Sequence, residues 1–291
     1  MASEGKGSRV FLLAVLFFLL LAGALGAIHS LPGYSSPLGN GQPFIAKVRI
    51  EGPIFDPEKT IEALRRVEDN PRAKGLLLVI NSPGGAVVPS WEIHDLVARI
   101  AQKKPVAVSM QALAASGGYL IACAGSRIFA YGATATGSIG VILQTFSLSG
   151  LMNKIGIQGN AIVSGPLKDA GSPFSSMSAA DEKYLQGIVM NIRDQFVQLV
   201  AADRHIPPAR VDALATGQVY TGLEAQKLGL VDAIGGEHAA KNWLLAQLKL
   251  PADTRVREVG SENTLAGWFS TAASSAIAYL VAQSTARFYL F

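Results

Sequence analysis

Short apolar runs alternate along the chain with stretches whose apolar positions recur every three or four residues. Runs bounded by Gly, Pro or Asn indicate buried strands, and the three-to-four spacing indicates helices that bury one face. This alternation favours an α/β fold with a largely parallel sheet. The predicted elements are, in order, strand 44–50, helix 57–68, strand 75–81, helix 91–102, strand 105–109, strands 128–131 and 138–143, a helix around Leu151 and strand 161–164.

The pattern changes in the segment 165–178, which contains two Pro, two Gly and four Ser and is predicted to be a loop. Loops carried by rigid scaffolds are frequent places for chemistry. The loop leads into a long predicted helix, 179–204. The remaining predicted elements are a short helix 207–214, a strand 218–221, a helical turn 224–228 and a closing helix 238–248.

Residues 10–28 form a continuous apolar stretch without a charged or strongly polar side chain. As a helix it would span roughly 28 Å, about the hydrocarbon thickness of a bilayer. Lys6 and Arg9 precede it, which predicts that residues 1–9 are a cytoplasmic tail and that the chain after residue 28 lies on the opposite side. We therefore expect a transmembrane anchor. A cleavable signal peptide is the alternative, because the small residues 22–24, near the end of the apolar stretch, would suit a cleavage site.

Two further segments flank the predicted domain. Residues 29–43 are rich in Gly, Pro and Ser and are expected to be a linker. Residues 251–291 form a C-terminal segment in which 265–282 carry no charge and have one apolar helical face. This stretch has too much Ser, Thr and Ala to predict a membrane span, so either an interfacial helix or a helix that packs between subunits is expected.

The composition narrows the classes of protein. A chain of 291 residues with 49% apolar residues can bury one main core. The net charge of +4 is modest and the basic residues are scattered, so no nucleic-acid partner is expected. Cys123 is the single cysteine, which excludes an intrachain disulfide and predicts a residue that fills core space.

The stretch MQALAASGGYLIACA, residues 110–124, contains the first candidate for chemistry, Ser116. It follows an apolar strand and opens a helix of small residues, where free first-turn amides favour developing negative charge. The small neighbours Ala115, Gly117 and Gly118 would let another chain approach its hydroxyl. Taken alone, the same residues are more typical of an N-cap serine on a tightly packed helix.

The sequence VINSPGG, residues 79–85, is a second candidate. Glycines directly after a strand permit positive φ angles and expose backbone N–H groups, which an oxyanion hole requires. The same residues also form ordinary turns.

A nucleophilic serine needs a base to remove its proton. The four histidines, at positions 29, 94, 205 and 238, lie beside the predicted membrane span or in sequence that looks exposed, without a convincing partner. A lysine is the other option, because burial in an apolar pocket favours its neutral form. Among twelve lysines, Lys168 stands in the loop 165–178, which holds few other charges, and the neighbouring Asp169 is expected to be a loop or turn residue.

Five motifs together identify a resemblance: VINSPGG, AASGGYLIACAG, TGSIGV, GPLKDAGSPF and GQVYTGLEAQKLGLVDAIGG. In this order they resemble the signal peptide peptidase A family of membrane-bound serine-lysine proteases, over residues 44–250. The resemblance implies an α/β domain with the fold shared by Clp proteases and crotonases. It implies that Ser116 is the nucleophile, that Lys168 is the general base, and that Gly85 and the amide of Gly117 form the oxyanion hole.

The resemblance also implies an activity. The expected protein is a single-pass enzyme of the bacterial inner membrane whose extracytoplasmic domain cleaves peptides in or near the membrane, such as leftover signal peptides, without metal or cofactor. Single-domain relatives assemble into homo-oligomeric rings in which the serine of one subunit meets the lysine of its neighbour. Two alternatives remain at this level: a crotonase-like acyl-CoA enzyme and a catalytically silent membrane scaffold.

Overall fold

The computed structural model describes residues 41–260, and their strands form one sheet of eight strands. The strands are β1 (Phe44–Glu51), β2 (Ala73–Ser82), β3 (Val106–Ala115), β4 (Arg127–Ala130), β5 (Ala135–Gly137), β6 (Val219–Thr221), β7 (Ala233–Ile234) and β8 (Val256–Glu258). The helices are α2 (Glu58–Asp69), α3 (Val87–Ala101), α4 (Gly117–Cys123), α5 (Ser149–Lys154), α6 (Ala179–Arg204), α7 (Pro208–Leu214), α8 (Gly222–Leu228) and α9 (Glu237–Leu248).

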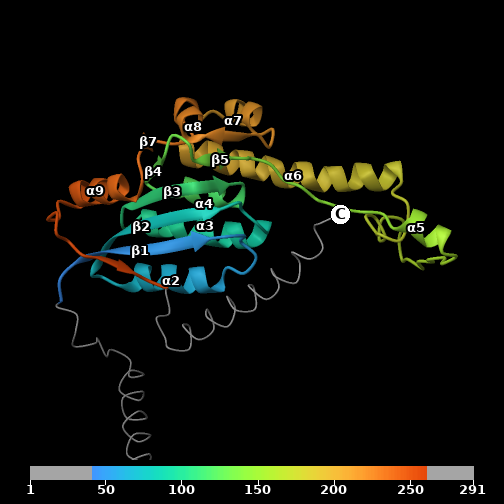
Figure 1. Ribbon diagram of the computed structural model, residues 1–291, viewed down its shortest axis with the longest axis horizontal. Helices are drawn as coiled ribbons and strands as arrows, with labels where there is room; N and C mark the ends of the chain where they lie inside the picture. Colours follow the sequence, from blue (N-terminus) through green and yellow to red (C-terminus); the bar gives the residue numbers. More distant parts are fainter. Residues whose placement is uncertain (1–40, 261–291) are drawn as a thin grey trace, which may run out of the picture. The chain divides into compact units, whose positions relative to one another are not determined.

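The sheet has the order β6-β5-β3-β2-β1-β8, and β4 extends it by pairing with β3 and β7 (Figure 1). The pairing is parallel throughout the described residues except between β5 and β6. The predicted α/β fold with a largely parallel sheet is therefore confirmed. In a parallel arrangement the carboxyl ends of neighbouring strands meet at one edge of the sheet, so the segments that leave β2 and β3 are brought together there.

Both faces of the central strands are buried, as a parallel sheet requires. Leu76 and Leu78 of β2 belong to the large apolar core that includes residues of α2, α3, α4 and α6. Leu77 and Val79, which alternate with them, belong to a second core beneath α9. Successive side chains of a strand point to opposite faces, so the continuous apolar run of β2 supplies both cores.

The structure corrects several predicted boundaries. β3 continues to Ala115, six residues beyond the predicted end at 109, so the strand leads directly into Ser116. The predicted strands 138–143 and 161–164 are wrong, because β5 ends at Gly137 and no strand follows before β6. The apolar residues there find no partner strand. The short strands β5, β7 and β8 were not predicted.

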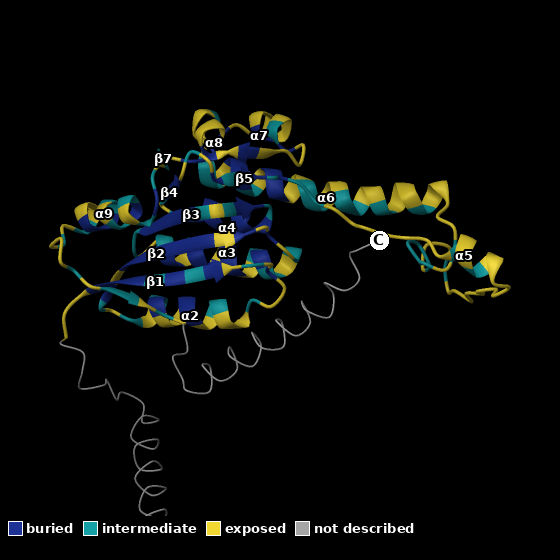
Figure 2. Ribbon diagram, in the orientation of Figure 1, coloured by how far each residue is buried: buried dark blue, intermediate teal, exposed yellow. Residues whose placement is uncertain are grey.

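Residues 140–195, here called the arm, contain no buried residue, in contrast to the sheet (Figure 2). The arm consists of the chain after β5, α5, the loop 165–178 and the first two thirds of α6. Only the end of α6 reaches the core, through Phe196, Val197, Val200 and Ala201. Large apolar side chains are exposed along the arm, among them Ile142, Phe146, Leu151, Ile155, Ile162 and Phe174.

The predicted anchor 10–28 and the amphipathic stretch 265–282 lie outside the described residues. Within 41–260, no helix combines the length and the apolar character that crossing a bilayer requires.

Candidate functional site

Ser116 occupies the turn between β3 and α4. Its backbone has φ 52° and ψ −121°, a conformation that is rare for a residue with a side chain and costs about 1 to 3 kcal/mol. The surrounding structure holds it there, because the Ser116 amide donates to Gly137 O at 2.9 Å and the Ser116 carbonyl accepts from Leu120 N at 2.9 Å. Every residue of α4 is buried while Ser116 is half-buried. A strained strand-to-helix turn of this kind presents a serine hydroxyl from a rigid base.

The turn that follows β2 is held by hydrogen bonds on both of its sides. The Gly84 amide donates to Ser82 Oγ at 3.1 Å. Ile54 binds the turn from the opposite side, because its amide donates to Gly84 O at 2.9 Å and its carbonyl accepts from Ala86 N at 2.7 Å. These bonds form an isolated parallel bridge between Ile54 and Gly85.

The two turns lie against each other. A Cβ added at Gly84 would lie 2.6 Å from the Gly117 nitrogen and 2.9 Å from Ser116 Cβ. Gly84 also has φ +93°, a conformation that side chains rarely adopt. A Cβ at Gly117 would clash with Ser90 Oγ. The approach of the two turns therefore requires glycine at position 84, and Ser90 of α3 leaves no space for a side chain at position 117.

Two backbone amides of these turns have no acceptor among the described residues. Within residues 41–260, neither the Gly85 amide nor the Gly117 amide donates a hydrogen bond. Gly117 is the first residue of α4, whose amide has no acceptor inside the helix. The predicted residues Ser116, Gly85 and Gly117 thus belong to two turns that contact each other through Gly84.

Lys168 lies apart from this cluster. It is exposed in the arm, and its amide donates to Gly165 O at 3.1 Å in a local turn. In the described part of the chain, no hydrogen bond or ion pair joins its side chain to Ser116 or to any other residue. Figure 1 places the α5 segment of the arm at the end of α6 that points away from the sheet. Asp169 accepts a hydrogen bond from Ser175 Oγ at 3.0 Å, as expected for a loop residue.

The predicted histidine environment is wrong at position 94. His94 is only 6% exposed, and its Nε2 lies 2.7 Å from Asp203 Oδ2 at the end of α6. Its Nδ1 lies 3.0 Å from Asp95 Oδ1. This group joins α3 to α6, and within residues 41–260 no hydrogen bond or ion pair links it to Ser116.

Cys123 is buried and free, which confirms its predicted place in the core. Burial raises the pKa of this thiol to about 12, so it carries no thiolate near neutral pH and does not compete with Ser116 as a nucleophile. In residues 41–260, no three His, Cys, Asp or Glu side chains are grouped closely enough to hold a metal ion.

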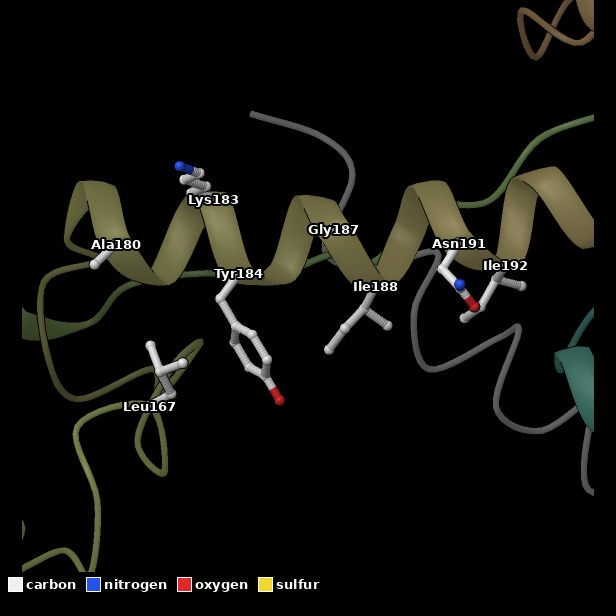
Figure 3. Close-up of a pocket in the computed structure, with 8 residues that line it drawn as sticks. All are labelled: Leu167, Ala180, Lys183, Tyr184, Gly187, Ile188, Asn191 and Ile192. Atoms are coloured by element: carbon white, nitrogen blue, oxygen red, sulfur yellow. The ribbon is translucent and has the colours of Figure 1, made fainter.

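A groove of about 650 Å³ lies on the exposed part of α6, far along the chain from Ser116 (Figure 3). Tyr184, Ile188 and Ile192 project into it from one side of the helix, and Leu167 faces them from the loop that carries Lys168. The groove is mainly apolar and open. It contains none of Ser116, Gly85 and Gly117, so this groove belongs to the arm.

Sequence reasoning missed three residues of this site: Ser82, Gly84 and Ile54. The motif SPGG contains the first two, but only Gly85 was assigned a role. Ile54 belongs to a different strand connection, and its contact with the turn depends on tertiary structure.

Comparison with known proteins adds an independent result. The sequence model of Peptidase family S49 matches residues 98–250, which include Ser116 and Lys168, and that of Clp protease matches residues 48–136. A protein of Methanocaldococcus jannaschii, named as a candidate protease, is 34% identical over 273 residues, which cover 87% of each chain. A protein of Enterococcus faecium, named as a candidate signal peptide peptidase SppA, is 37% identical over 211 residues, 72% of this chain and 61% of that protein.

A plant protein is also similar. The chloroplastic serine protease SPPA of Arabidopsis thaliana is 31% identical over 215 residues, which are 72% of this chain and 32% of that protein. The chain thus spans less than two thirds of the Enterococcus and Arabidopsis relatives. The α/β fold, the two family matches and the extent of the alignments lead to one assignment: the chain belongs to peptidase family S49, in the group of the signal peptide peptidase SppA proteins.

Proposed function

We propose that the chain is a membrane-anchored serine endopeptidase in which Ser116 is the nucleophile and Lys168 is the general base. The observation that carries the proposal is the position of Ser116 on a strained turn that contacts the turn of Gly84 and Gly85, together with the amides of Gly85 and Gly117, which have no acceptor within residues 41–260. Membership of peptidase family S49 makes peptide bonds the expected substrate. The printed name of the Enterococcus faecium relative suggests signal peptides as a substrate class.

The reaction follows from these groups. Ser116 Oγ attacks the carbonyl carbon of the scissile bond while the neutral amine of Lys168 takes the hydroxyl proton. The negative charge that forms on the carbonyl oxygen is stabilised by the two amides. Lys168 then gives the proton to the leaving amine, which leaves an acyl group on Ser116. Water then attacks this ester as it gives a proton to the same lysine, and Lys168 returns that proton to Ser116 Oγ as the acid product leaves.

We propose further that a second copy of the chain completes the site. Lys168 and Ser116 do not meet within one described chain, although the reaction needs them in contact. The arm that carries Lys168 exposes apolar side chains over its length, together with the groove on α6 (Figure 3). A partner subunit that covers this surface would bury apolar area, exclude water and favour the neutral lysine that a base has to be. A homo-oligomeric ring, as the resemblance implies, meets this need.

Point variants test the two side chains. Ser116→Ala and Lys168→Ala should each lower kcat by several orders of magnitude, and the double variant should be little worse, because the two groups act as one unit. Lys168→Arg should be equally inactive, since a guanidinium keeps its proton. Lys154→Ala is the matched control, because Lys154 is an exposed lysine of the same arm. Substantial activity of folded Lys168→Ala protein would refute the assignment of the base.

Mixed oligomers test the shared site. Co-expression of Ser116→Ala and Lys168→Ala chains would create interfaces at which an intact serine meets an intact lysine, so part of the activity should return. If both groups came from one chain, every site would lack one of them. Mixed oligomers verified by two affinity tags and still inactive would contradict the shared site while leaving the roles of both residues standing.

The proposal includes the arrangement predicted for the whole chain: a cytoplasmic tail 1–9, an anchor 10–28, a linker 29–43, an extracytoplasmic peptidase domain 44–250 and a C-terminal amphipathic segment 251–291. It is supported by Lys6 and Arg9 before the apolar stretch. Protease added to spheroplasts should therefore digest the domain. Full protection in intact spheroplasts, with digestion only after lysis, would reverse the orientation.

A further inference from the structure

The backbone amides of the turn 83–86 can be accounted for one by one. Pro83 has none. The Gly84 amide is bound by Ser82 Oγ, and the Ala86 amide is bound by Ile54 O. Among the amides of this turn, only that of Gly85 lacks an acceptor within residues 41–260. The turn is therefore fixed immediately before and immediately after the one N–H group that it leaves free.

Ser82 is well suited to fix the turn. It is completely buried at the end of β2 and pairs with Ala114, two residues before Ser116. Its carbonyl lies against α4, because a Cβ at Gly118 would be 2.9 Å from Ser82 O. The hydroxyl is therefore attached to the same rigid strand pair that carries Ser116, and its bond to Gly84 links the turn to that pair.

We propose that Ser82 is a positioning residue for peptide hydrolysis: its hydroxyl holds the Gly84 amide so that the next amide, that of Gly85, points toward the oxyanion beside Ser116. The inference rests on the proposed function. Without Ser82 Oγ, the buried Gly84 amide would lose its acceptor, and the turn would shift to find another. The Gly85 amide would move with it. An oxyanion donor acts in the transition state, so its displacement affects kcat rather than substrate binding.

The test compares Ser82→Ala with Ser109→Ala in the full chain. Ser109 is a matched control, because it is a fully buried serine of the adjacent strand β3 whose hydroxyl, among the described residues, binds only Gln111 Nε2. For a fluorogenic peptide that the wild-type chain cleaves, Ser82→Ala should lower kcat roughly 10- to 100-fold, less than complete loss of an oxyanion donor, with KM within about twofold. Ser109→Ala should leave both constants unchanged.

A peptide boronic acid provides a second measurement, because its adduct with Ser116 places an anionic oxygen beside the two amides. Its inhibition constant should rise in Ser82→Ala by about the same factor as kcat falls, whereas a non-reactive competitive peptide should bind as before. If Ser82→Ala does not fold, Ser82→Cys keeps the volume but offers a poor acceptor, and the same losses are expected.

Three results would overturn the inference: unchanged kcat in folded Ser82→Ala, an increase in KM without loss of kcat, or an equal loss in Ser109→Ala. Ser116→Ala separates this inference from the proposed function. If activity survives Ser116→Ala, the proposed function fails and the role of Ser82 with it. If activity is lost in Ser116→Ala but intact in Ser82→Ala, only the role of Ser82 is refuted.

Discussion

Replacement of Gly84 by alanine tests whether the contact between the two turns is needed for catalysis. The added Cβ would lie 2.6 Å from the Gly117 nitrogen, about 0.8 Å short of the 3.4 Å at which ordinary contact begins. It would also lie 2.9 Å from Ser116 Cβ and 2.9 Å from Ala115 O. The three neighbours belong to backbone or to a Cβ and cannot rotate away, so one turn has to move relative to the other.

The size of this displacement gives the expected loss of activity. A misplacement of about 1 Å in a preorganised site costs about 100-fold in rate, so a shift of about 0.8 Å is expected to lower kcat roughly 50- to 100-fold. The Cβ also strains the backbone at φ +93°, which costs about 1 to 2 kcal/mol of the free energy of unfolding.

Gly217→Ala is the control that separates the backbone strain from the displacement of the turns. Gly217 has a similar φ of +80°, but a Cβ there would have nothing within 4 Å. Both variants should lose the stability that the positive φ costs, and Gly84→Ala should lose more because its Cβ also clashes. Only Gly84→Ala should lose kcat against a cleavable peptide. Equal kcat values for the two folded variants would refute the argument that the spacing of the turns sets the activity.

Three predictions concern stability. Burial opposes the charged form of His94, but its hydrogen bonds to Asp203 and Asp95 outweigh this desolvation and raise its pKa. Protonated His94 therefore stabilises the fold fully below the pKa of histidine in the unfolded chain, and this contribution is lost as pH rises through the raised pKa. His94→Gln should remove that part of the pH dependence of the free energy of unfolding. Arg204→Met should lower the free energy of unfolding by about 2 kcal/mol, because it leaves Asp232 without its buried partner, the carboxylate itself being 30% exposed; no change in the denaturation midpoint would contradict this. Lys249 ends α9 in a left-handed conformation (φ 53°), so Lys249→Gly should raise the melting temperature by relieving about 1 kcal/mol of strain.

Local periodicity was sufficient to predict most of the fold. The sheet strands β1 and β2 and the helices α2, α6 and α7 begin and end within two residues of their predicted bounds. Such elements are specified by apolar spacing over about ten residues, and the burial of both faces of β2 follows from its continuous apolar run. The apolar segments 138–143 and 161–164 have the same local signal, but a strand also needs a neighbour to pair with, and no local pattern supplies one.

The candidate site also has features that the local sequence predicts and features that only the tertiary structure decides. The position of Ser116 between a strand and a helix, and the glycines after β2, are local features that the sequence alone made visible. The resemblance assigned roles to Ser116, Lys168, Gly85 and Gly117, and these roles stay predictions. The clash of a Gly84 side chain with the Gly117 nitrogen and the bond from Gly84 to Ser82 belong to the folded molecule, because they depend on how far apart two backbones lie.

The tertiary structure also decided which predicted residues meet. Parallel strands end at a common edge, so residues that follow β2 and β3 converge although more than thirty positions separate Gly84 from Gly117. The arm extends from this edge, and Lys168 lies exposed in it. Its apolar neighbours are also exposed in the described residues. Apolar spacing specifies which residues have side chains suited to burial, whereas the surface that buries them is set by contacts between segments far apart in the chain.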